Sequence, residues 1–251
     1  EGEYEDAYAI LDELGKKEVI AESKYNRACE MIKNRNYKEA YEILGGLNYK
    51  DSEEKIAEIS MAMLKQCNVG DTVFFGDYHG TVEWLVLDKQ DGEVFLNSKY
   101  CLNAKPYNEK DEPVTWESCT LRQWLNDEFI NETFTEEEKA LICDTYLQNP
   151  DNPEYGTDGG NDTTDKVFFL SIDEAEKYFD NTAARRTDAT DYAKGIRVSS
   201  GDGSWWWLRS PGHCAYDVAA VGRDGSVYYN GCRVYNYEIG VRPAMWINLQ
   251  S

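Results

Sequence analysis

The residues best suited to contact a ligand lie in segment 213–238. This stretch alternates glycine, alanine and serine with tyrosine, asparagine, arginine, histidine and aspartate. Tyrosine supplies a wide contact area at a low entropic cost, and the polar side chains supply varied hydrogen bonds. We therefore predict a ligand-binding surface formed by nine residues: His213, Tyr216, Arg223, Tyr228, Tyr229, Asn230, Arg233, Tyr235 and Tyr237.

We expect these nine side chains to be largely exposed and to share one face. The glycines between them predict short hairpins, and Asn230-Gly231 is the clearest turn of the segment. Hairpins in a row leave their tips side by side, so residues near the tips share a surface. The alternative interpretation is an ordinary tyrosine-rich β-meander with hydrated turns, which side chains buried in the core would favour.

The sequence carries no signature of an enzyme. His79 and His213 are the only histidines, so a three-histidine metal site is impossible. The seven cysteines form no C-x-x-C pair, and neither a P-loop, a dinucleotide fingerprint nor a serine nucleophile elbow occurs. We expect a non-enzymatic protein with no catalytic residue, no metal and no cofactor. Abundant carboxylates leave paired-carboxylate chemistry open.

Residues 158–165, with the sequence DGGNDTTD, bring several oxygen ligands close together along the chain. Closely spaced Asp and Asn oxygens can surround Ca²⁺, but the EF-hand spacing and its terminal Glu are missing. We therefore favour a solvated loop in which Asp165 caps the next strand, with calcium as the alternative.

Composition narrows the class of partner. A formal net charge of -21 argues against nucleic acid and against an anionic membrane surface. No apolar run of about 18 residues occurs, so membrane insertion is not expected. A signal peptide is also missing, and the start at Glu1 suggests a fragment of a longer protein. Dispersed cysteines favour a reducing, cytoplasmic compartment. The oligomeric state stays open.

Residues 1–67 are predicted to be a helical-repeat segment. The stretch 4–11 aligns with 37–44 at an offset of 33 residues, close to the period of tetratricopeptide-type repeats. We expect a helix from Tyr4 to about Leu14, a second from Ala21 to Asn34, and one each over the stretches that begin at Tyr37 and Asp51.

Residues 68–251 are predicted to form a mixed α+β domain, because the hydrophobic period changes near Val69 from that of a helix to that of a strand. Apolar alternation and turn residues predict its strands and helices. The expected strands are 70–76, 82–88, 93–98, 166–171, 205–208, 218–221, 226–229, 233–235 and 241–249, and the main expected helices are 120–129, 135–143 and 172–179.

Four ordered motifs stand out in this second part. They are TWESCTLRQWLN at 115–126, DKVFFLS at 165–171, WLRSPG at 207–212 and GVRPAMWINL at 240–249. Together they resemble a bacterial domain family of unassigned function that is common in gut Firmicutes. The ending also resembles the variable proteins of diversity-generating retroelements and the formylglycine-generating-enzyme branch of the C-type lectin-like fold.

This resemblance implies a C-type lectin-like domain in which a terminal strand closes the fold. It implies that the stretch between the Trp-containing strand and that terminal strand carries the ligand contacts. The motif residues themselves are then scaffold: Trp207, Leu208, Trp246, Ile247 and Leu249 in the core, and Arg209 and Arg242 in structural ion pairs or backbone contacts.

Retroelement mutagenesis turns Asn codons into Tyr, His, Cys, Arg, Asp or Ser codons, and segment 213–238 holds that set. We therefore expect a recognition protein whose C-terminal surface, possibly diversified in this way, binds a protein or a glycan. Two alternatives stay open. One is an interaction module that binds through its helical repeats, and the other is a glycan-active or redox enzyme.

Overall fold

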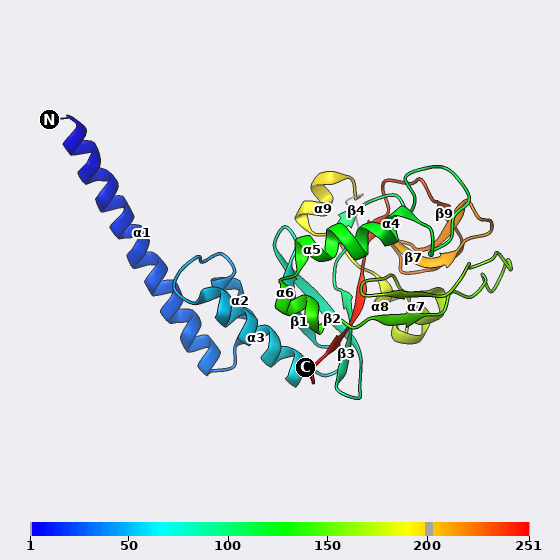
Figure 1. Ribbon diagram of the computed structural model, residues 1–251, viewed down its shortest axis with the longest axis horizontal. Helices are drawn as coiled ribbons and strands as arrows, with labels where there is room; N and C mark the ends of the chain where they lie inside the picture. Colours follow the sequence, from blue (N-terminus) through cyan, green and yellow to red (C-terminus); the bar gives the residue numbers. More distant parts are fainter. Residues whose placement is uncertain (1, 199–202, 251) are drawn as a thin grey trace. The chain divides into compact units, whose positions relative to one another are not determined.

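The computed structural model describes residues 2–198 and 203–250, with side chains from Glu13 onward. The chain divides into two compact units, Glu1–Gln66 and Cys67–Ser251. The described elements of the first unit are helices, and those of the second are a mixture of strands and short helices (Figure 1). Within the described ranges, no helix has both the length and the apolar character needed to cross a membrane.

The first unit consists of α1 (Gly2–Lys33), α2 (Tyr37–Leu44) and α3 (Ser52–Gln66). Its apolar side chains recur at helical spacing, which lets the three helices bury one stripe each. The buried apolar residues of this unit are Ala28, Ala40, Tyr41, Leu44, Ile59 and Leu64.

Helix α1 corrects one prediction. The sequence predicted two helices, 4–14 and 21–34, whereas the structure has one continuous helix through Gly15. Glycine inside a helix costs only about 1 kcal/mol relative to alanine, and the lysines that follow it favour a helix. The turn required for a first helix pair is therefore missing, and Leu14 and Ile20 are 54% and 56% exposed.

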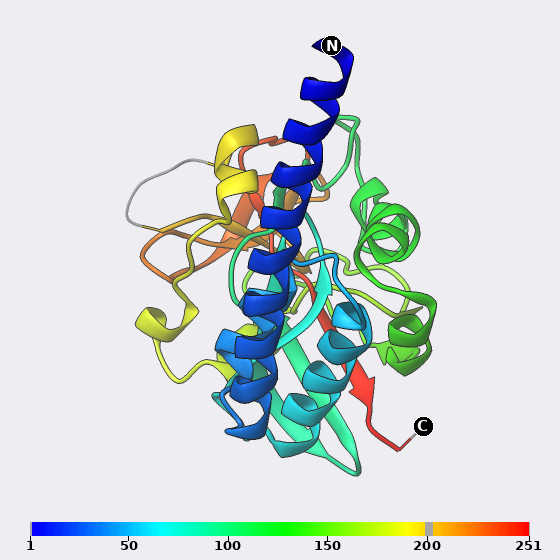
Figure 2. The ribbon, with the colours of Figure 1, turned by 90° about the vertical axis from the view of Figure 1, so that its left-hand side faces the viewer.

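The second unit contains a four-stranded antiparallel sheet in the order β1-β2-β3-β11. Strands β1 (Thr72–Asp77), β2 (Thr81–Gln90) and β3 (Glu93–Ser98) follow one another as hairpins. The C-terminal strand β11 (Ala244–Asn248) then pairs with β3, and it is the red arrow beside the teal hairpin in Figure 2.

A five-stranded sheet has the order β4-β10-β7-β8-β9. Its strands are β4 (Asn103–Ala104), β10 (Gly240–Val241), β7 (Trp206–Pro211), β8 (Asp217–Val221) and β9 (Val227–Arg233). Strands β7 and β8 are buried along their whole length, whereas β9 is an edge strand with exposed positions. A small ribbon joins β5 (Thr145–Leu147) to β6 (Thr163–Asp165).

Short helices complete the unit. In chain order they are α4 (Thr120–Trp124), the π-helical turn η1 (Leu125–Phe129), α5 (Ile130–Thr133), α6 (Glu136–Leu141), α7 (Ile172–Tyr178), α8 (Thr182–Arg185) and α9 (Asp191–Ile196). Thr135 and Ser171 begin α6 and α7 with capping boxes, as their sequence patterns favour. The second unit is therefore a mixed α+β structure.

Arg242 lies where the chain passes from one sheet to the other. The single strand predicted over 241–249 is instead two strands, because Pro243 lacks an N–H for the ladder. The Arg242 side chain is buried, and its guanidinium donates to the Ser98 carbonyl at 2.9 Å and to the Arg185 carbonyl at 3.2 Å. It also lies 4.7 Å from the centre of the Trp206 ring. Burial lowers the pKa of Arg242 to about 10.

Arg209 is the second buried guanidinium, and it forms an ion pair with Glu174 of α7. It also donates to the Phe169 carbonyl at 2.8 Å and to Asn149 Oδ1 at 3.2 Å. Arg209 and Arg242 thus have the structural roles that the sequence predicted. The remaining predicted core residues of the motifs are mostly buried as well: Trp207, Leu208 and Ile247 fully, and Trp246 and Leu249 partly.

Asp165 joins two of the four motifs, 115–126 and 165–171. Its buried carboxylate accepts from Trp116 Nε1 at 2.9 Å, from Arg122 Nε at 2.7 Å and from Thr163 Oγ1 at 2.8 Å. The strand predicted over 166–171 is wrong: its pairing is limited to an isolated bridge, Phe168 to Ala244. The Asn126 side chain binds the backbone of Lys166 and Val167, so side-chain contacts rather than a ladder hold the start of the segment.

We predict that Arg242→Leu lowers the free energy of unfolding of the second unit by about 3 kcal/mol, because the buried Ser98 carbonyl loses its guanidinium donor, the Arg185 carbonyl keeps only Trp206 Nε1, and the cation–π contact with the Trp206 ring is lost. All seven tryptophans lie between positions 84 and 246, so denaturant unfolding followed by tryptophan fluorescence reports on this unit. Arg223→Leu, at an exposed position, is the matched control and should stay within about 0.5 kcal/mol of the wild type. Equal effects of the two substitutions would contradict the role of Arg242.

Candidate functional site

None of the nine predicted site residues is buried. Tyr229 and Tyr237 are half-buried, and the other seven are exposed. Tyr235 has 47% of its surface exposed, and Tyr216 and Tyr228 have 37% each. The segment is therefore accessible to a ligand, and the arrangement of its residues decides which of them can act together.

The turn predicted at Asn230-Gly231 is wrong, because both residues lie inside β9. Gly231 has a φ of 78°, and a Cβ at this position would lie 2.5 Å from the Val218 carbonyl oxygen. The register of β8 and β9 shifts there, as at a β-bulge. The hairpin turn lies at Gly222–Ser226, where the Gly222 N–H donates to the Ser226 carbonyl at 2.9 Å. Strand 233–235 is also missing as a separate element.

Four of the nine residues lie, with Asp111, in two contact groups that follow one another along the chain on either side of Val234. The Arg233 guanidinium lies 5.0 Å from the centre of the Tyr216 ring and binds both carboxylate oxygens of Asp111, at 3.0 and 3.1 Å. Tyr235 and Tyr237 form an edge-to-face pair with ring centres 5.0 Å apart. We call Asp111, Tyr216, Arg233, Tyr235 and Tyr237 the tyrosine–arginine surface.

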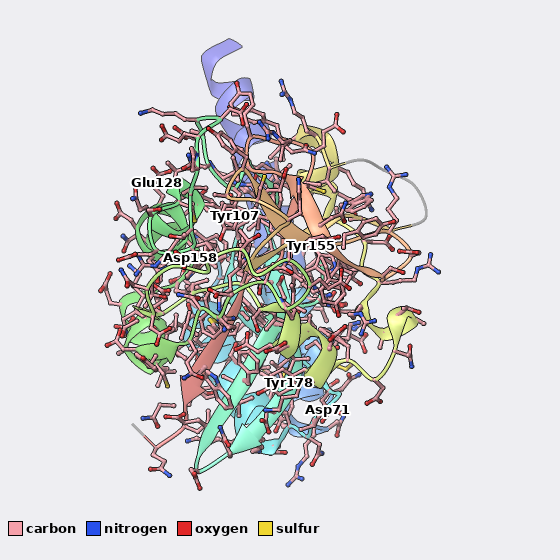
Figure 3. The ribbon with its side chains drawn as sticks, turned by 90° about the vertical axis from the view of Figure 1, so that its right-hand side faces the viewer. Asp71, Tyr107, Glu128, Tyr155, Asp158 and Tyr178 are labelled. Atoms are coloured by element: carbon pink, nitrogen blue, oxygen red, sulfur yellow. The ribbon has the colours of Figure 1, made fainter. Side chains whose placement is uncertain are left out.

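A cleft of about 350 Å³ opens beside α4 and η1. Its polar and aromatic lining residues are Lys105, Glu109, Thr120, Gln123, Trp124, Asp127 and Glu128. The Lys105 ammonium lies 4.7 Å from the centre of the Trp124 ring, a cation–π contact. Asp127 and Glu128 come from the π-helical turn, a distortion that is frequent at functional sites. Figure 3 shows Glu128 on the helical side of the unit and Tyr107 nearer its centre.

A chain of hydrogen bonds joins the tyrosine–arginine surface to the wall of the cleft. Val234 N–H donates to the Tyr216 carbonyl at 3.0 Å, and the Val234 carbonyl accepts from Asn108 N–H at 2.9 Å. Asn108 Oδ1 accepts from Thr120 N–H at 3.2 Å, and Thr120 Oγ1 accepts from Glu109 N–H at 3.0 Å. The surface and the cleft therefore belong to one hydrogen-bonded framework.

The electrostatics agree with this proximity. The pKa of Tyr237 is raised chiefly by a hydrogen bond to Tyr235, and the negative charge of Glu109 adds to the shift. Glu109 lines the cleft, so the tyrosine pair lies close to the cleft wall. Sequence reasoning missed the cleft, because its residues come from two segments that meet through tertiary hydrogen bonds, those of Asn108 with Thr120 and of Leu121 with Tyr107 among them.

The other five predicted residues lie elsewhere, so the nine do not form one cluster. Tyr228 packs on Trp205 with ring centres 4.4 Å apart, and Arg223 lies in the nearby β8–β9 turn. Tyr229 follows Tyr228 in the strand and so faces the opposite side, where its hydroxyl donates to Glu176. His213 and Asn230 are joined by a backbone hydrogen bond of 3.0 Å.

His213, Cys214 and Asp217 bring three metal-binding atoms within 4.8 Å of one another. The Asp217 Oδ2 atom lies 3.0 Å from His213 Nδ1 and 3.1 Å from Cys214 Sγ. Among the residues that the structure describes, no other group of three histidine, cysteine or acidic side chains is brought together in this way.

In the acidic loop 158–165, each carboxylate has its own hydrogen-bond partners. Asp158 accepts from the Gly160 N–H at 2.8 Å, Asp162 from the Asn149 N–H at 2.9 Å, and Asp165 binds Trp116 and Arg122. These partners differ for each residue, and so the carboxylates serve as caps and core contacts rather than as one ligand set. The solvated-loop interpretation fits Asp158 and Asp162, whereas Asp165 is buried.

Comparison with known proteins adds one finding. Residues 91–249 match the family described as Domain of unknown function (DUF6273). The chain belongs to this family. The match starts in the turn between β2 and β3 and extends through β11, so it covers the cleft, the tyrosine–arginine surface and all four motifs. No curated protein and no solved structure matches the chain.

Cysteine labelling tests the packing around this site. Burial raises the pKa of both Cys101 and Cys119 to about 12, whereas Cys214 is half-exposed. Because the thiolate is the reactive form, we predict that Cys214 reacts with a maleimide in the folded protein at mildly alkaline pH while Cys101 and Cys119 do not. Peptide mapping by mass spectrometry identifies the modified residues. Rapid labelling of Cys101 or Cys119 without denaturant would contradict the structure.

Proposed function

We propose that this protein is a recognition module rather than an enzyme, and that it binds a glycan or protein ligand at the cleft and the tyrosine–arginine surface. The observation that carries the proposal is the hydrogen-bonded framework from Tyr216 through Val234 and Asn108 to Thr120. It fixes exposed tyrosine rings beside a polar cleft, so a ligand could contact both at once.

The chemistry of this site suits a polyhydroxylated or amine-bearing group. Glu109, Asp127 and Glu128 offer carboxylate acceptors, and Gln123 offers both a donor and an acceptor. Exposed tyrosine rings can pack on the C–H faces of a sugar or on apolar side chains. Arg233 is held by Asp111 before any ligand arrives, which lowers the entropic cost of binding. The net charge of -21 favours a neutral or basic ligand.

The proposal includes a C-type lectin-like fold with a variable surface of the retroelement type. The difference in burial between the motif residues and the residues between the motifs supports this part of the proposal. Strand β7 and strand β10, which carry two motifs, are buried throughout. Between them, 213–238 carries exposed side chains on a backbone fixed by the buried strand β8. Such a scaffold tolerates changes of its exposed side chains without loss of the core.

A glycan-active enzyme is the second candidate, because three carboxylates line the cleft. Paired carboxylates are the usual groups for glycoside hydrolysis. A screen of chromogenic glycosides separates the two functions. Turnover that disappears in both Asp127→Asn and Glu128→Gln would favour the enzyme, whereas binding without turnover favours recognition.

We predict that Tyr235→Ala and Arg233→Ala each weaken ligand binding at least ~10-fold, because both remove contacts at the centre of the proposed surface. The ligand is first found with the full chain on an array of neutral and amine-bearing glycans and by pull-down from lysates of candidate host cells. Affinities are then measured by biolayer interferometry. Tyr146→Ala is the matched control, since Tyr146 is 66% exposed but lies on β5.

Two outcomes would contradict this assignment. Equal loss of affinity in Tyr235→Ala and Tyr146→Ala would show that the tyrosine–arginine surface has no special part. Loss of affinity in Ile20→Glu, with Tyr235→Ala unaffected, would instead support an interaction module that binds through its helices, because Ile20 is an exposed apolar residue of α1.

A further inference from the structure

The turn between β7 and β8 holds three side chains in a fixed arrangement. Gly212 N–H donates to the Asp217 carbonyl at 2.7 Å, and Asp217 N–H donates to the Cys214 carbonyl at 2.9 Å. His213 N–H donates to the Asn230 carbonyl of β9 at 3.0 Å, which ties the turn to the neighbouring strand. A Cβ at Gly212 would lie 2.6 Å from the same Asn230 oxygen, so only glycine fits there.

The side-chain atoms of this turn converge around Asp217. Asp217 is buried, and its Oδ2 atom lies 3.0 Å from His213 Nδ1 and 3.1 Å from Cys214 Sγ. A tetrahedral zinc ion with bonds of about 2.0–2.3 Å would hold such atoms about 3.2–3.7 Å apart. A lengthening of these two distances by a few tenths of an ångström, with the His213 and Cys214 donor atoms drawn together from their present separation of at most 4.8 Å, would therefore admit a metal between the three atoms.

The donor set selects the kind of metal. Imidazole nitrogen, thiolate sulfur and carboxylate oxygen together suit a borderline ion such as Zn²⁺, whereas Ca²⁺ and Mg²⁺ prefer oxygen ligands alone. One thiolate and one carboxylate would neutralise the two charges of the ion. His213 is exposed and Cys214 half-exposed, so an ion can enter from solvent and keep a fourth position open.

The neighbouring groups have other partners. The pKa of Arg233 is raised chiefly by the hydrogen bond of its guanidinium to Asp111, and the charges of Asp217 and Cys214 add to the shift. Cys232 is half-buried, and its thiol lies close enough to Asp217 for the negative charge of that carboxylate to act on it. It is not one of the three converging side chains. Water or a ligand atom is therefore the natural occupant of the fourth position.

We infer that His213, Cys214 and Asp217 form a zinc-binding site in the β7–β8 turn. On binding, the Cys214 thiol releases its proton to solvent and the thiolate bonds to the metal. The hydrogen bond of this thiol to the carboxylate is lost, and His213 Nδ1, which lies 3.0 Å from Asp217 Oδ2 and 3.3 Å from the Asn230 carbonyl, binds zinc while the imidazole carries its proton on Nε2. This inference stands without the proposed recognition function, because it needs only the geometry of the turn.

The test is a zinc titration of the full chain under a phosphine reductant, against a chromophoric chelator and with excess Mg²⁺ to suppress binding by scattered carboxylates. The expected result is one Zn²⁺ per chain. His213→Ala and Cys214→Ser should each weaken binding at least ~100-fold, because even the loss of an outer partner of a metal ligand costs 10- to 100-fold. Matched controls are His79→Ala, which alters the other histidine, and Cys143→Ser; both should bind zinc as the wild type does.

A second readout identifies the donor atom. Cobalt bound in place of zinc should give a thiolate-to-metal charge-transfer absorption that is present in His79→Ala and missing in Cys214→Ser. His213 is exposed and serine is close in size to cysteine, so both variants should unfold at the wild-type denaturant concentration. The inference is overturned if the wild type shows no saturable zinc binding, or if His213→Ala and Cys214→Ser bind zinc as tightly as the controls.

Discussion

The buried guanidinium of Arg242 is the contact on which the second unit depends. It lies between the end of β3, helix α8 and the Trp206 ring, and it donates to carbonyls that have no place in a regular ladder. Asn97 adds a second contact at this connection between the sheets, since its amide donates to the Pro243 carbonyl at 3.0 Å. Because a buried charge is costly without partners, this arrangement fixes how the chain leaves one sheet and enters the other. Both sheets are thereby joined through strands β10 and β11, which are consecutive in sequence.

The contacts of Arg242 and Asn97 that connect the two sheets do not involve the side chains of the segment between β7 and β10. This segment can therefore carry exposed side chains. Strand β8 is fully buried and holds the segment from the inside, while β9 lies at the sheet edge with Tyr228 and Asn230 in solvent. The segment then returns towards residues 108–111, where Asn108 ties it to the cleft wall. A rigid interior with a chemically varied edge is what a recognition protein needs, because binding then requires little ordering of the chain.

Sequence patterns predicted most strands and helices of the second unit, because burial alternates in β2 and because β1, β3, β7 and β8 are short apolar runs bounded by turn residues. They failed where a contact distant in sequence decides the outcome. Two helices were predicted over 4–14 and 21–34, yet nothing crowds Gly15 and the helix continues through it. Asn230-Gly231 seemed a turn, but the chain turns at Gly225, whose close approach to the Thr182 carbonyl no local pattern reveals. The exposure of the site residues followed from their polarity. Their division among separate groups, and the cleft itself, depend on the Asn108 contacts between distant segments.

The central claim is that the cleft and the tyrosine–arginine surface bind a ligand together. Differential hydrogen–deuterium exchange of the full chain, with and without the tightest-binding compound from the array, tests it most directly. The account predicts that amides in 105–112, 120–128 and 233–238 are protected by the ligand, with little change in 145–165 or in 13–66. Protection confined to the helical unit or to the β5–β6 ribbon, with these three stretches unchanged, would contradict it.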